Sequence, residues 1–323
     1  MSSKTIEVEH LSKTYGAVEA IADIHFSVKA GEIVGFLGPN GAGKTTTMRI
    51  LAGYLPATTG TAKIAGYDVH RQAMQVRRRI GYLPEIPPLY PDMTVRGYLS
   101  FVAKIKGIGK KRRDRVNNAM ARCQLLKHQD TVIRKLSKGY RQRVGIAQAI
   151  VHEPPVIILD EPTVGLDPRQ IIEVRNLIKS LAGEHTIILS THILPEASMI
   201  CDRVTIINRG RVVTSNTPSN LQTQLESSLG YEVEIAGAPQ DILSSISQIT
   251  GVTRVVLAEQ PPIEHPQHHL LKISCTGDRE PGKDIAAAIV RQNLELHEMR
   301  RTRPSLEDIF LELTTEENLD TDR

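Results

Sequence analysis

The stretch "IVGFLGPNGAGKTTTMRIL", residues 33–51, decides the fold. It opens with a short apolar run that predicts a buried strand, passes through a glycine-rich loop and continues at helical spacing. Gly38 to Thr45 fits the pattern G-x-x-x-x-G-K-[ST] in the strand–loop–helix context that phosphate-binding loops require. In such loops backbone N–H groups face phosphate oxygens, Lys44 adds a charge for the outer phosphates and Thr45 offers a hydroxyl to Mg²⁺. The stretch therefore predicts a nucleotide-binding site, with a plain glycine-rich turn as the alternative.

Outward from this loop, the chain as far as Pro218 alternates short apolar runs with helical patterns. Further apolar runs are "VIILDE" at 156–161, "TIILSTH" at 186–192 and "VTIIN" at 204–208. Short apolar runs separated by helices predict a mostly parallel sheet that is buried on both faces. Residues 87 to about 135 interrupt the alternation with a mainly helical stretch. We therefore expect an α/β domain over residues 1–218, with a helical subdomain at about 87–150.

The pattern changes at "TSNTPSN", residues 214–220, which has the composition of a linker. Strand and helix patterns then follow in the order βαββαβ, with helices from about Gln240 and about Gly282. This order is typical of a ferredoxin-like unit. A last helix is expected from Ser305. We therefore expect a small ferredoxin-like α+β domain over residues 219–323.

Composition narrows the possible classes of protein. The net charge of +4 over 323 residues is compatible with an acidic membrane surface or with nucleic acid, and selects neither. Cys123, Cys201 and Cys275 form no CxxC pair, which favours a reducing compartment. No apolar run reaches the length of a bilayer-spanning helix, and residues 1–10 lack a signal-peptide core. We therefore expect a chain that is soluble by itself.

Two clusters allow more than one interpretation. The basic run at residues 110–113 is most simply a solvated loop or helix end, with lipid or nucleic-acid contact as the alternative. His265, His268 and His269 are expected in a proline-rich loop. A solvated loop is favoured there over metal binding, because no cysteine or carboxylate shares the ligand spacing.

A second part of the site is expected after the strand at 156–159. Asp160 follows that strand at its carboxyl end, where ligands bind in open α/β sheets, and is expected to hold Mg²⁺. Glu161 is the candidate that orients the attacking water, because hydrolytic phosphoryl transfer depends mainly on positioning and charge neutralisation. A capping or surface role for this acidic pair is the alternative. His192 is expected to contact the γ-phosphate and Glu161, with simple packing as its alternative.

A second anion-binding helix start is expected in "LSKGYRQRVGIAQAI", residues 136–150. Ser137 precedes a basic amphipathic run at helical spacing, which is typical of a capped helix N-terminus. The chain therefore contains two helix starts suited to phosphate.

Taken together, these motifs resemble those of the ATP-binding subunit of ABC transporters, and the resemblance covers residues 5 to about 215. The signature motif is matched by Leu136, Ser137 and Gly139, the D-loop by Gly165, Leu166 and Asp167, and the switch histidine by His192. Tyr15 stands where the family places an aromatic residue on the adenine ring. The resemblance implies an ATPase of the ABC cassette fold with ATP and Mg²⁺ as cofactors.

Site residues follow from the resemblance, position by position. ATP contacts fall on Tyr15, Gly38, Pro39, Asn40, Gly41, Ala42, Gly43, Lys44, Thr45 and Thr46. Contacts from a second subunit fall on Ser137, Gly139 and Asp167, metal contacts on Thr45, Asp160 and Glu85, and catalytic roles on Glu161, His192 and Lys44. The family also implies head-to-tail pairing, in which Ser137 and Gly139 of one subunit close over the phosphate held by Lys44 of the other.

The branch that serves ABC-2 type exporters is the most similar, with the gliding-motility type nearest. "GYLPE", "STHIL" and the late stretch "RTRPSLEDIF" carry this likeness. It implies a homodimer at the cytoplasmic face of the membrane, a separately encoded transmembrane permease and no nucleic-acid partner. We expect the permease to dock near residues 85–105, where Leu89 and Tyr90 belong to an apolar loop; packing of that loop on the helical subdomain is the alternative.

Two departures from the family pattern stand out. Glu85 replaces the usual Q-loop glutamine, and Lys138 and Tyr140 flank Gly139 where a glycine and a glutamine are commoner. Lys138 is expected either to strengthen a phosphate contact or to face solvent. The rival classes are an ABC ATPase of translation or DNA repair and a P-loop kinase or GTPase. The first usually carries tandem cassettes or a long coiled coil, and the second leaves "LSKGY" without a purpose.

Overall fold

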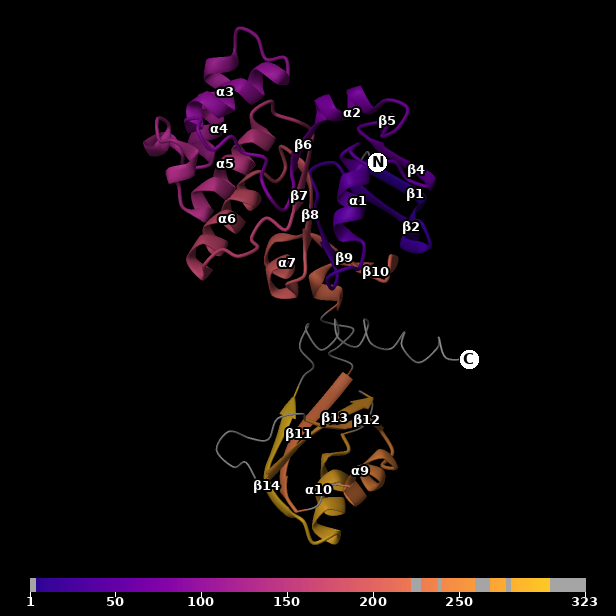
Figure 1. Ribbon diagram of the computed structural model, residues 1–323. Coiled ribbons are helices and arrows are strands. Elements are labelled where there is room, and N and C mark those ends of the chain that lie inside the picture. Colours follow the sequence, from indigo (N-terminus) through magenta and orange to yellow (C-terminus); the bar gives the residue numbers. More distant parts are fainter. Residues whose placement is uncertain (1–3, 222–227, 238–239, 259–267, 277–279, 303–323) are drawn as a thin grey trace. The chain divides into compact units, whose positions relative to one another are not determined.

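The computed structural model describes residues 4–221, 228–237, 240–258, 268–276 and 280–302 (Figure 1). The chain divides into two compact units, Met1–Pro218 and Ser219–Arg323. Each unit has its own sheet and its own buried apolar core.

The first unit is organised around a six-stranded sheet with strand order β10–β9–β3–β8–β7–β6. The strands are β3 (Ile33–Leu37), β6 (Ile80–Leu83), β7 (Val156–Asp160), β8 (Thr186–Thr191), β9 (Arg203–Asn208) and β10 (Arg211–Asn216). The strands from β9 to β6 pair in parallel, and β10 pairs antiparallel with β9. Every residue of β3, β7 and β8 is buried, so these apolar runs form the centre of the mostly parallel sheet, as expected.

The prediction that residues 214–220 form a linker is wrong for the first three of these residues. Thr214, Ser215 and Asn216 belong to β10, because each of them pairs with a residue of β9. Polar composition alone did not distinguish this edge strand from a connecting loop.

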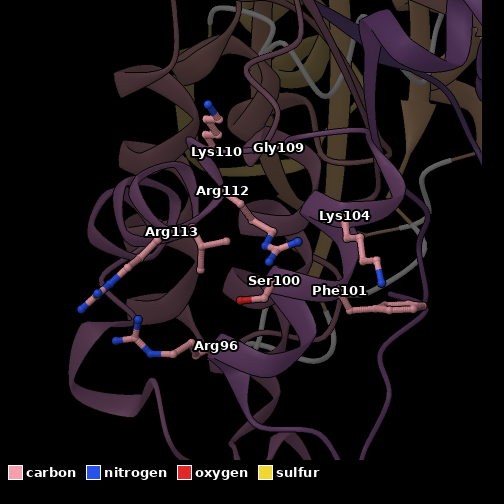
Figure 2. A pocket seen from close by; sticks show the side chains of 9 residues that line it. Arg96, Ser100, Phe101, Lys104, Gly109, Lys110, Arg112 and Arg113 are labelled. Carbon is pink, nitrogen blue, oxygen red and sulfur yellow. The ribbon is translucent and has the colours of Figure 1, made fainter.

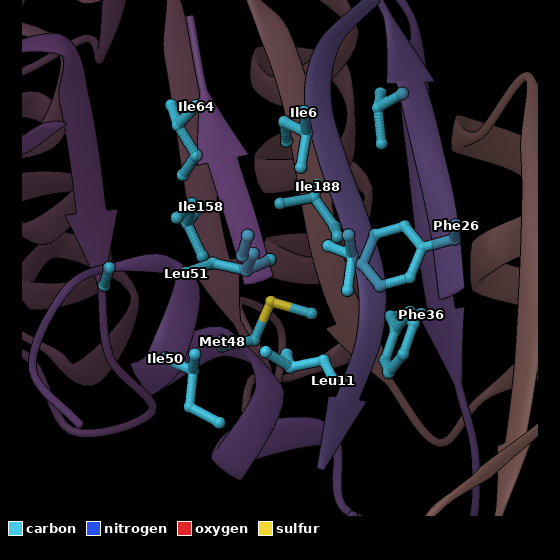
Figure 3. Close-up of a cluster of buried hydrophobic side chains, with 14 of the residues drawn as sticks. Ile6, Leu11, Phe26, Phe36, Met48, Ile50, Leu51, Ile64, Ile158 and Ile188 are labelled. Atoms are coloured by element: carbon cyan, nitrogen blue, oxygen red, sulfur yellow. The ribbon is translucent and has the colours of Figure 1, made fainter. Parts of the chain in front are cut away.

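A second, four-stranded antiparallel sheet covers one side of the first unit, in the order β2–β1–β4–β5. Its strands are β1 (Lys4–Tyr15), β2 (Val18–Lys29), β4 (Thr59–Ile64) and β5 (Tyr67–Asp68). Figure 3 shows the core between this sheet, the parallel strands and α1 (Lys44–Leu51), where Met48 and Leu51 lie among Ile6, Phe36 and Ile158. Burying such side chains stabilises the fold by roughly 1.5–3 kcal/mol each. This packing fixes the helix that carries Lys44.

The remaining helices of the first unit are α2 (Ala73–Arg79), α3 (Val95–Ile105), α4 (Arg112–Arg122), α5 (Lys138–Ile150), α6 (Pro168–Ser180) and α7 (Leu194–Ile200). In Figure 1, α3 to α6 gather on one side of the parallel strands, and α1 and the antiparallel sheet lie on the other. Thr94 caps α3 by accepting a hydrogen bond from the backbone N–H of Gly97 at 3.1 Å. Throughout the described ranges, no helix is both long enough and apolar enough to cross a membrane.

The second unit contains a four-stranded antiparallel sheet in the order β12–β13–β11–β14. Its elements are β11 (Ser228–Ala236), α9 (Gln240–Ser247), β12 (Val252–Leu257), β13 (His268–Thr276), α10 (Gly282–Arg291) and β14 (Glu295–Thr302). Ile242 and Ile246 of α9 and Ile285 and Ile289 of α10 are buried in one cluster with the sheet residue Val233. Both helices therefore pack on the same sheet.

The proline-rich loop expected around three histidines is wrong for two of them. His268 and His269 lie in β13, paired with Ala236 and Ile235 of β11, because the ladder continues to the start of the strand. His265 and the helix expected from Ser305 lie outside the described residues.

Candidate nucleotide site

The glycine-rich loop joins β3 to α1 through a conformation that needs glycine. Gly43 has a φ of 103°, and a Cβ atom there would lie 2.7 Å from the carbonyl oxygen of Ala20. A Cβ atom at Gly38 would collide with the carbonyl oxygen of Ile207. Any larger residue at either position would displace the loop from the end of the sheet.

Lys44 is held by its own loop at the start of α1. Its Nζ atom donates to the carbonyl oxygens of Gly38 at 2.7 Å and Pro39 at 3.1 Å, and lies 3.5 Å from Oε1 of Glu161. Both charged side chains are buried, with 6% of Lys44 and 7% of Glu161 exposed. A buried ammonium near a buried carboxylate forms a charge pair in which each charge offsets the burial of the other. A bound phosphate would compete with Glu161 for the ammonium and pair with it more strongly.

Asp160 presents one unpartnered oxygen to the site. Its Oδ1 accepts hydrogen bonds from Ser190 at 2.6 Å and Thr45 at 3.2 Å, whereas the buried Oδ2 has no hydrogen-bond partner among the residues that the structure describes. Burial raises the pKa of Asp160 above its usual range; the Ser190 and Thr45 hydrogen bonds oppose this rise, and the charges of Glu161 and Glu85 add to it. An orphaned carboxylate oxygen next to a threonine hydroxyl is a donor set that fits Mg²⁺.

The backbone at Glu161, directly after β7, departs from the extended conformation of that strand. Its φ is 48°, in the left-handed region, and its backbone N–H donates to Oγ of Ser190 at 2.9 Å. Its carboxylate lies 3.0 Å (Oε2) and 3.2 Å (Oε1) from Nδ1 of His192. A non-glycine residue in this region costs on the order of 1–3 kcal/mol. That strain places the carboxylate between Lys44 and His192.

A cavity of about 260 Å³ collects many of the expected residues. It is lined by Asn40, Gly41, Gly43, Lys44, Thr45, Thr46, Glu85, Glu161 and His192, together with Ala20 and Val164. Of the other expected ATP contacts, Gly38, Pro39 and Ala42 belong to the loop without lining the cavity. Tyr15 lies at the end of β1, 47% exposed, with Nζ of Lys13 5.1 Å from its ring centroid.

The residues expected to act on a second subunit's ATP lie together, but outside this cavity. The exposed Ser137 caps α5, and its Oγ accepts from the N–H of Tyr140 at 3.4 Å. Asp167 caps α6 by accepting from the N–H of Gln170 at 2.9 Å, and a Cβ atom at Gly139 would meet the Gln170 side chain. The starts of α5 and α6 therefore form one surface, and none of the three expected residues is among those that line the cavity.

Neither expectation for Lys138 describes its position fully. Lys138 is exposed, but its ammonium occupies the space in which a Cβ atom of Gly165 would lie. Gly165 has a φ of 66°. Lys138 therefore packs against the D-loop of its own chain.

Two residues that hold the site in place through hydrogen bonds were not predicted from the sequence. Ser190 lies opposite Asp160 in the parallel pairing of β7 and β8, which lets one hydroxyl orient both acidic residues. Gln142 of α5 donates from Nε2 to the carbonyl oxygen of Pro162 at 2.8 Å and is buried. Ser190 could have been predicted from its position near the carboxyl end of the strand that follows "VIILDE". No local sequence feature indicated a role for Gln142.

This fold and this loop define a P-loop ATPase cassette. The family described as "ABC transporter" matches residues 21–164. The daunorubicin resistance ATP-binding protein DrrA3 of Streptomyces coeruleorubidus is 31% identical over 316 residues, covering 97% of each chain. The bacitracin transport ATP-binding protein BcrA of Bacillus licheniformis is 42% identical over 213 residues, 65% of this chain and 69% of that one.

Among solved structures, the dimeric post-hydrolysis state of the ATP-binding cassette MJ0796, bound to ADP and Pi, matches with a TM-score of 0.61 and 26% identity. The match covers 66% of this chain and 98% of that one. The chain belongs to the ATP-binding proteins of ABC transporters. It is therefore an ATP-binding subunit with ATPase activity, as the resemblance implied.

Proposed function

We propose that this chain is the ATPase subunit of an ABC-2 type exporter and works as a head-to-tail homodimer on the cytoplasmic face of the membrane. Support for export comes from relatives named for bacitracin transport and daunorubicin resistance. Bacitracin and daunorubicin belong to the names of those relatives and are not assigned to this chain.

One observation carries the dimer: the exposed cap residue Ser137 does not line the cavity that holds Lys44 in the same chain. Ser137 is exposed at the positive end of α5, where backbone N–H groups and the helix dipole favour an anion. A second copy in head-to-tail orientation brings Ser137 and Gly139 over the phosphates bound at Lys44, with Asp167 at the same contact. The cassette MJ0796 is itself recorded as a dimer.

Within each centre, the loop residues from Gly38 to Thr46 bind the phosphates and Tyr15 stacks on the adenine. Thr45 and Asp160 hold Mg²⁺, which when bound neutralises charge on the phosphate oxygens. Glu85 lines the same cavity and is a further oxygen ligand.

Catalysis rests on three side chains of the cavity. Glu161 orients the attacking water and accepts its proton, and His192 fixes the Glu161 carboxylate from 3.0 Å and reaches the γ-phosphate. Lys44 leaves its loop carbonyls to pair with the transferred phosphoryl group.

The remaining parts of the chain connect this centre to a partner. A separate transmembrane permease docks near residues 85–105, where Ile86 is 82% and Tyr90 is 53% exposed. The loop also packs on α3, since the hydroxyl of Tyr98 donates to the carbonyl oxygen of Pro88 at 3.1 Å. We assign the second unit to the ferredoxin-like fold on its βαββαβ order, and give it a role in supporting the dimer.

Mixing two inactive variants tests the proposal. Lys44→Ala removes the phosphate-binding cation, and Ser137→Ala removes the contact supplied to the other centre. Hybrid dimers keep one intact centre, so an equal mixture should recover roughly a quarter of wild-type turnover if centres act independently. Each variant alone is the control, and differently tagged subunits show whether hybrids form. Inactive mixtures that nevertheless contain hybrids would refute the two-chain centre.

A further inference from the structure

A second and larger cavity lies in the helical subdomain, between α3 and the start of α4 (Figure 2). Its volume is about 860 Å³. Five of its lining residues carry a positive charge, Arg96, Lys104, Lys110, Arg112 and Arg113, and the described lining contains no aspartate or glutamate. None of these residues lines the nucleotide cavity.

Within the part of the chain that the structure describes, most of this charge has no counterion. Arg96 bonds to neutral partners, the side-chain oxygens of Asn117 at 3.0 Å and of Gln129. Among the described residues, no carboxylate forms an ion pair with Lys104, Lys110, Arg112 or Arg113. Asp114 follows in the first turn of α4 but does not line the cavity. The cavity therefore has an uncompensated positive potential, which attracts anions.

Helix α4 adds a local conflict at the same place. It begins at Arg112, and its cap residue Lys111 makes no side-chain hydrogen bond to the first turn. Basic residues at 110–113 thus outnumber Asp114, the acidic residue of the first turn, at the positive end of the helix dipole, where cations destabilise a helix and anions stabilise it. Sequences tend to break such local rules at functional sites, and a bound anion resolves this conflict.

Apolar side chains in or next to the cavity indicate which class of anion it can bind. Phe101 lines the cavity and is 38% exposed, and Ile105, one turn further along α3, is 66% exposed. Figure 2 shows the Arg112 guanidinium of α4 directed toward Ser100 of α3. Phe101 and Lys104 belong to α3 as well. Cationic heads beside exposed apolar groups are the arrangement that binds an amphiphile at a membrane surface.

We propose that this cavity binds the phosphodiester headgroup of an anionic phospholipid. Lys104, Lys110, Arg112 and Arg113 contact the phosphate, while Phe101 and Ile105 contact the acyl-chain boundary. The permease contact proposed above then falls on the preceding loop, at Ile86 and Tyr90. A single-stranded nucleic acid held by base stacking would need several aromatic faces, and Phe101 is the one aromatic residue among the described residues that line the cavity. The shared chemistry is a phosphate-bearing anion, and the apolar contacts select the lipid as its source.

Vesicle binding by the purified full-length chain tests this proposal. Phosphatidylcholine vesicles with a third of phosphatidylglycerol should bind the chain at least about tenfold more tightly than vesicles of phosphatidylcholine alone, and high salt should remove the difference. Lys110→Ala with Arg112→Ala should lower that affinity by about tenfold or more. The matched control, Arg78→Ala with Lys179→Ala, removes two exposed charges outside the cavity and should change it less than about twofold.

Two further arms separate the alternatives. Phe101→Ser should weaken binding to the anionic vesicles without changing the response of the melting temperature to free glycerol phosphate. The melting temperature of the double variant should equal or exceed that of the wild type, since the variant relieves repulsion at the start of α4. Any one of three results would overturn the proposal. The Arg78/Lys179 control could lose as much affinity as the Lys110/Arg112 variant, or the Lys110/Arg112 variant could keep its affinity for anionic vesicles. The wild-type chain could also bind a short RNA more tightly than it binds anionic vesicles. These vesicles contain no permease and no ATP, so failure here leaves the proposed ATPase dimer untouched.

Discussion

The starts of helices α1 and α5 both suit a phosphate, yet they differ in how far their own chain completes them. At α1, the cap is Gly43, and Lys44 is 6% exposed among loop carbonyls and the carboxylate of Glu161. At α5, the cap is Ser137, an exposed residue whose hydroxyl bonds only back to Tyr140 among the contacts described for it. The side chain at the first start is held by contacts within its own chain, whereas the cap at the second start is exposed, as the proposed head-to-tail dimer requires.

Among the substitutions that test this difference, Glu161→Gln is expected to have the largest effect. The amide keeps the shape of the side chain but cannot accept a proton from water, so turnover should fall on the order of 10² or more while ATP binding persists. ATP should then hold two copies together, which raises the apparent mass in size-exclusion chromatography. The measurement is steady-state ATPase activity alongside dimer formation with ATP. Near-normal hydrolysis would remove Glu161 from the proposed role.

The sequence made the α1 site easier to predict than its surroundings. Gly38 to Thr45 lie within one short stretch, so their spacing alone specifies strand, loop and helix, and the structure has β3 and α1 there. Ser190 is 30 residues from Asp160 in the sequence, and its contact depends on the parallel register of β7 and β8. Registers between strands are set by tertiary packing, which a single sequence does not display.

The same limit explains the other misses. The basic run at 110–113 was visible, but the cavity exists because α3 brings Lys104 and Phe101 against it. His268 was placed in a loop by its proline-rich neighbourhood, whereas strand pairing with Ala236 extends β13 to include it. Local composition indicated these residues, and long-range contacts gave them their environment.

A smaller effect is expected from Ser190→Ala, which loosens the α1 site without touching α5. Losing the hydroxyl leaves both Oδ1 of Asp160 and the N–H of Glu161 with fewer partners, at a cost of about 1–2 kcal/mol, or roughly 5- to 30-fold in turnover. The Ser190 hydrogen bond also lowers the pKa of Asp160, so its loss raises that pKa further. Because metal binding needs the ionised carboxylate, the acidic limb of the Mg²⁺-dependent ATPase profile should move to higher pH.

A matched serine controls for this variant. Among the described residues, the hydroxyl of Ser198 in α7 bonds only to the carbonyl oxygen of Leu194, at 3.0 Å, so Ser198→Ala should leave the pH profile in place. An acidic limb that stays fixed in Ser190→Ala would mean that the serine stabilises the strands without tuning Asp160.

The smallest effect is expected at α5 itself, from Lys138→Ala. Lys138 is the first residue of the helix, where a positive charge opposes the helix dipole, so its removal should raise the free energy of unfolding by about 0.3–1 kcal/mol. The same change frees the D-loop at Gly165, so turnover should fall a few-fold, by roughly 1 kcal/mol or less in activation free energy, with the KM for ATP nearly unchanged. Urea unfolding and ATPase kinetics on one preparation separate the two effects. A rise in KM would instead place the Lys138 ammonium on a phosphate, and α5 would then resemble α1 more closely than its exposed cap suggests.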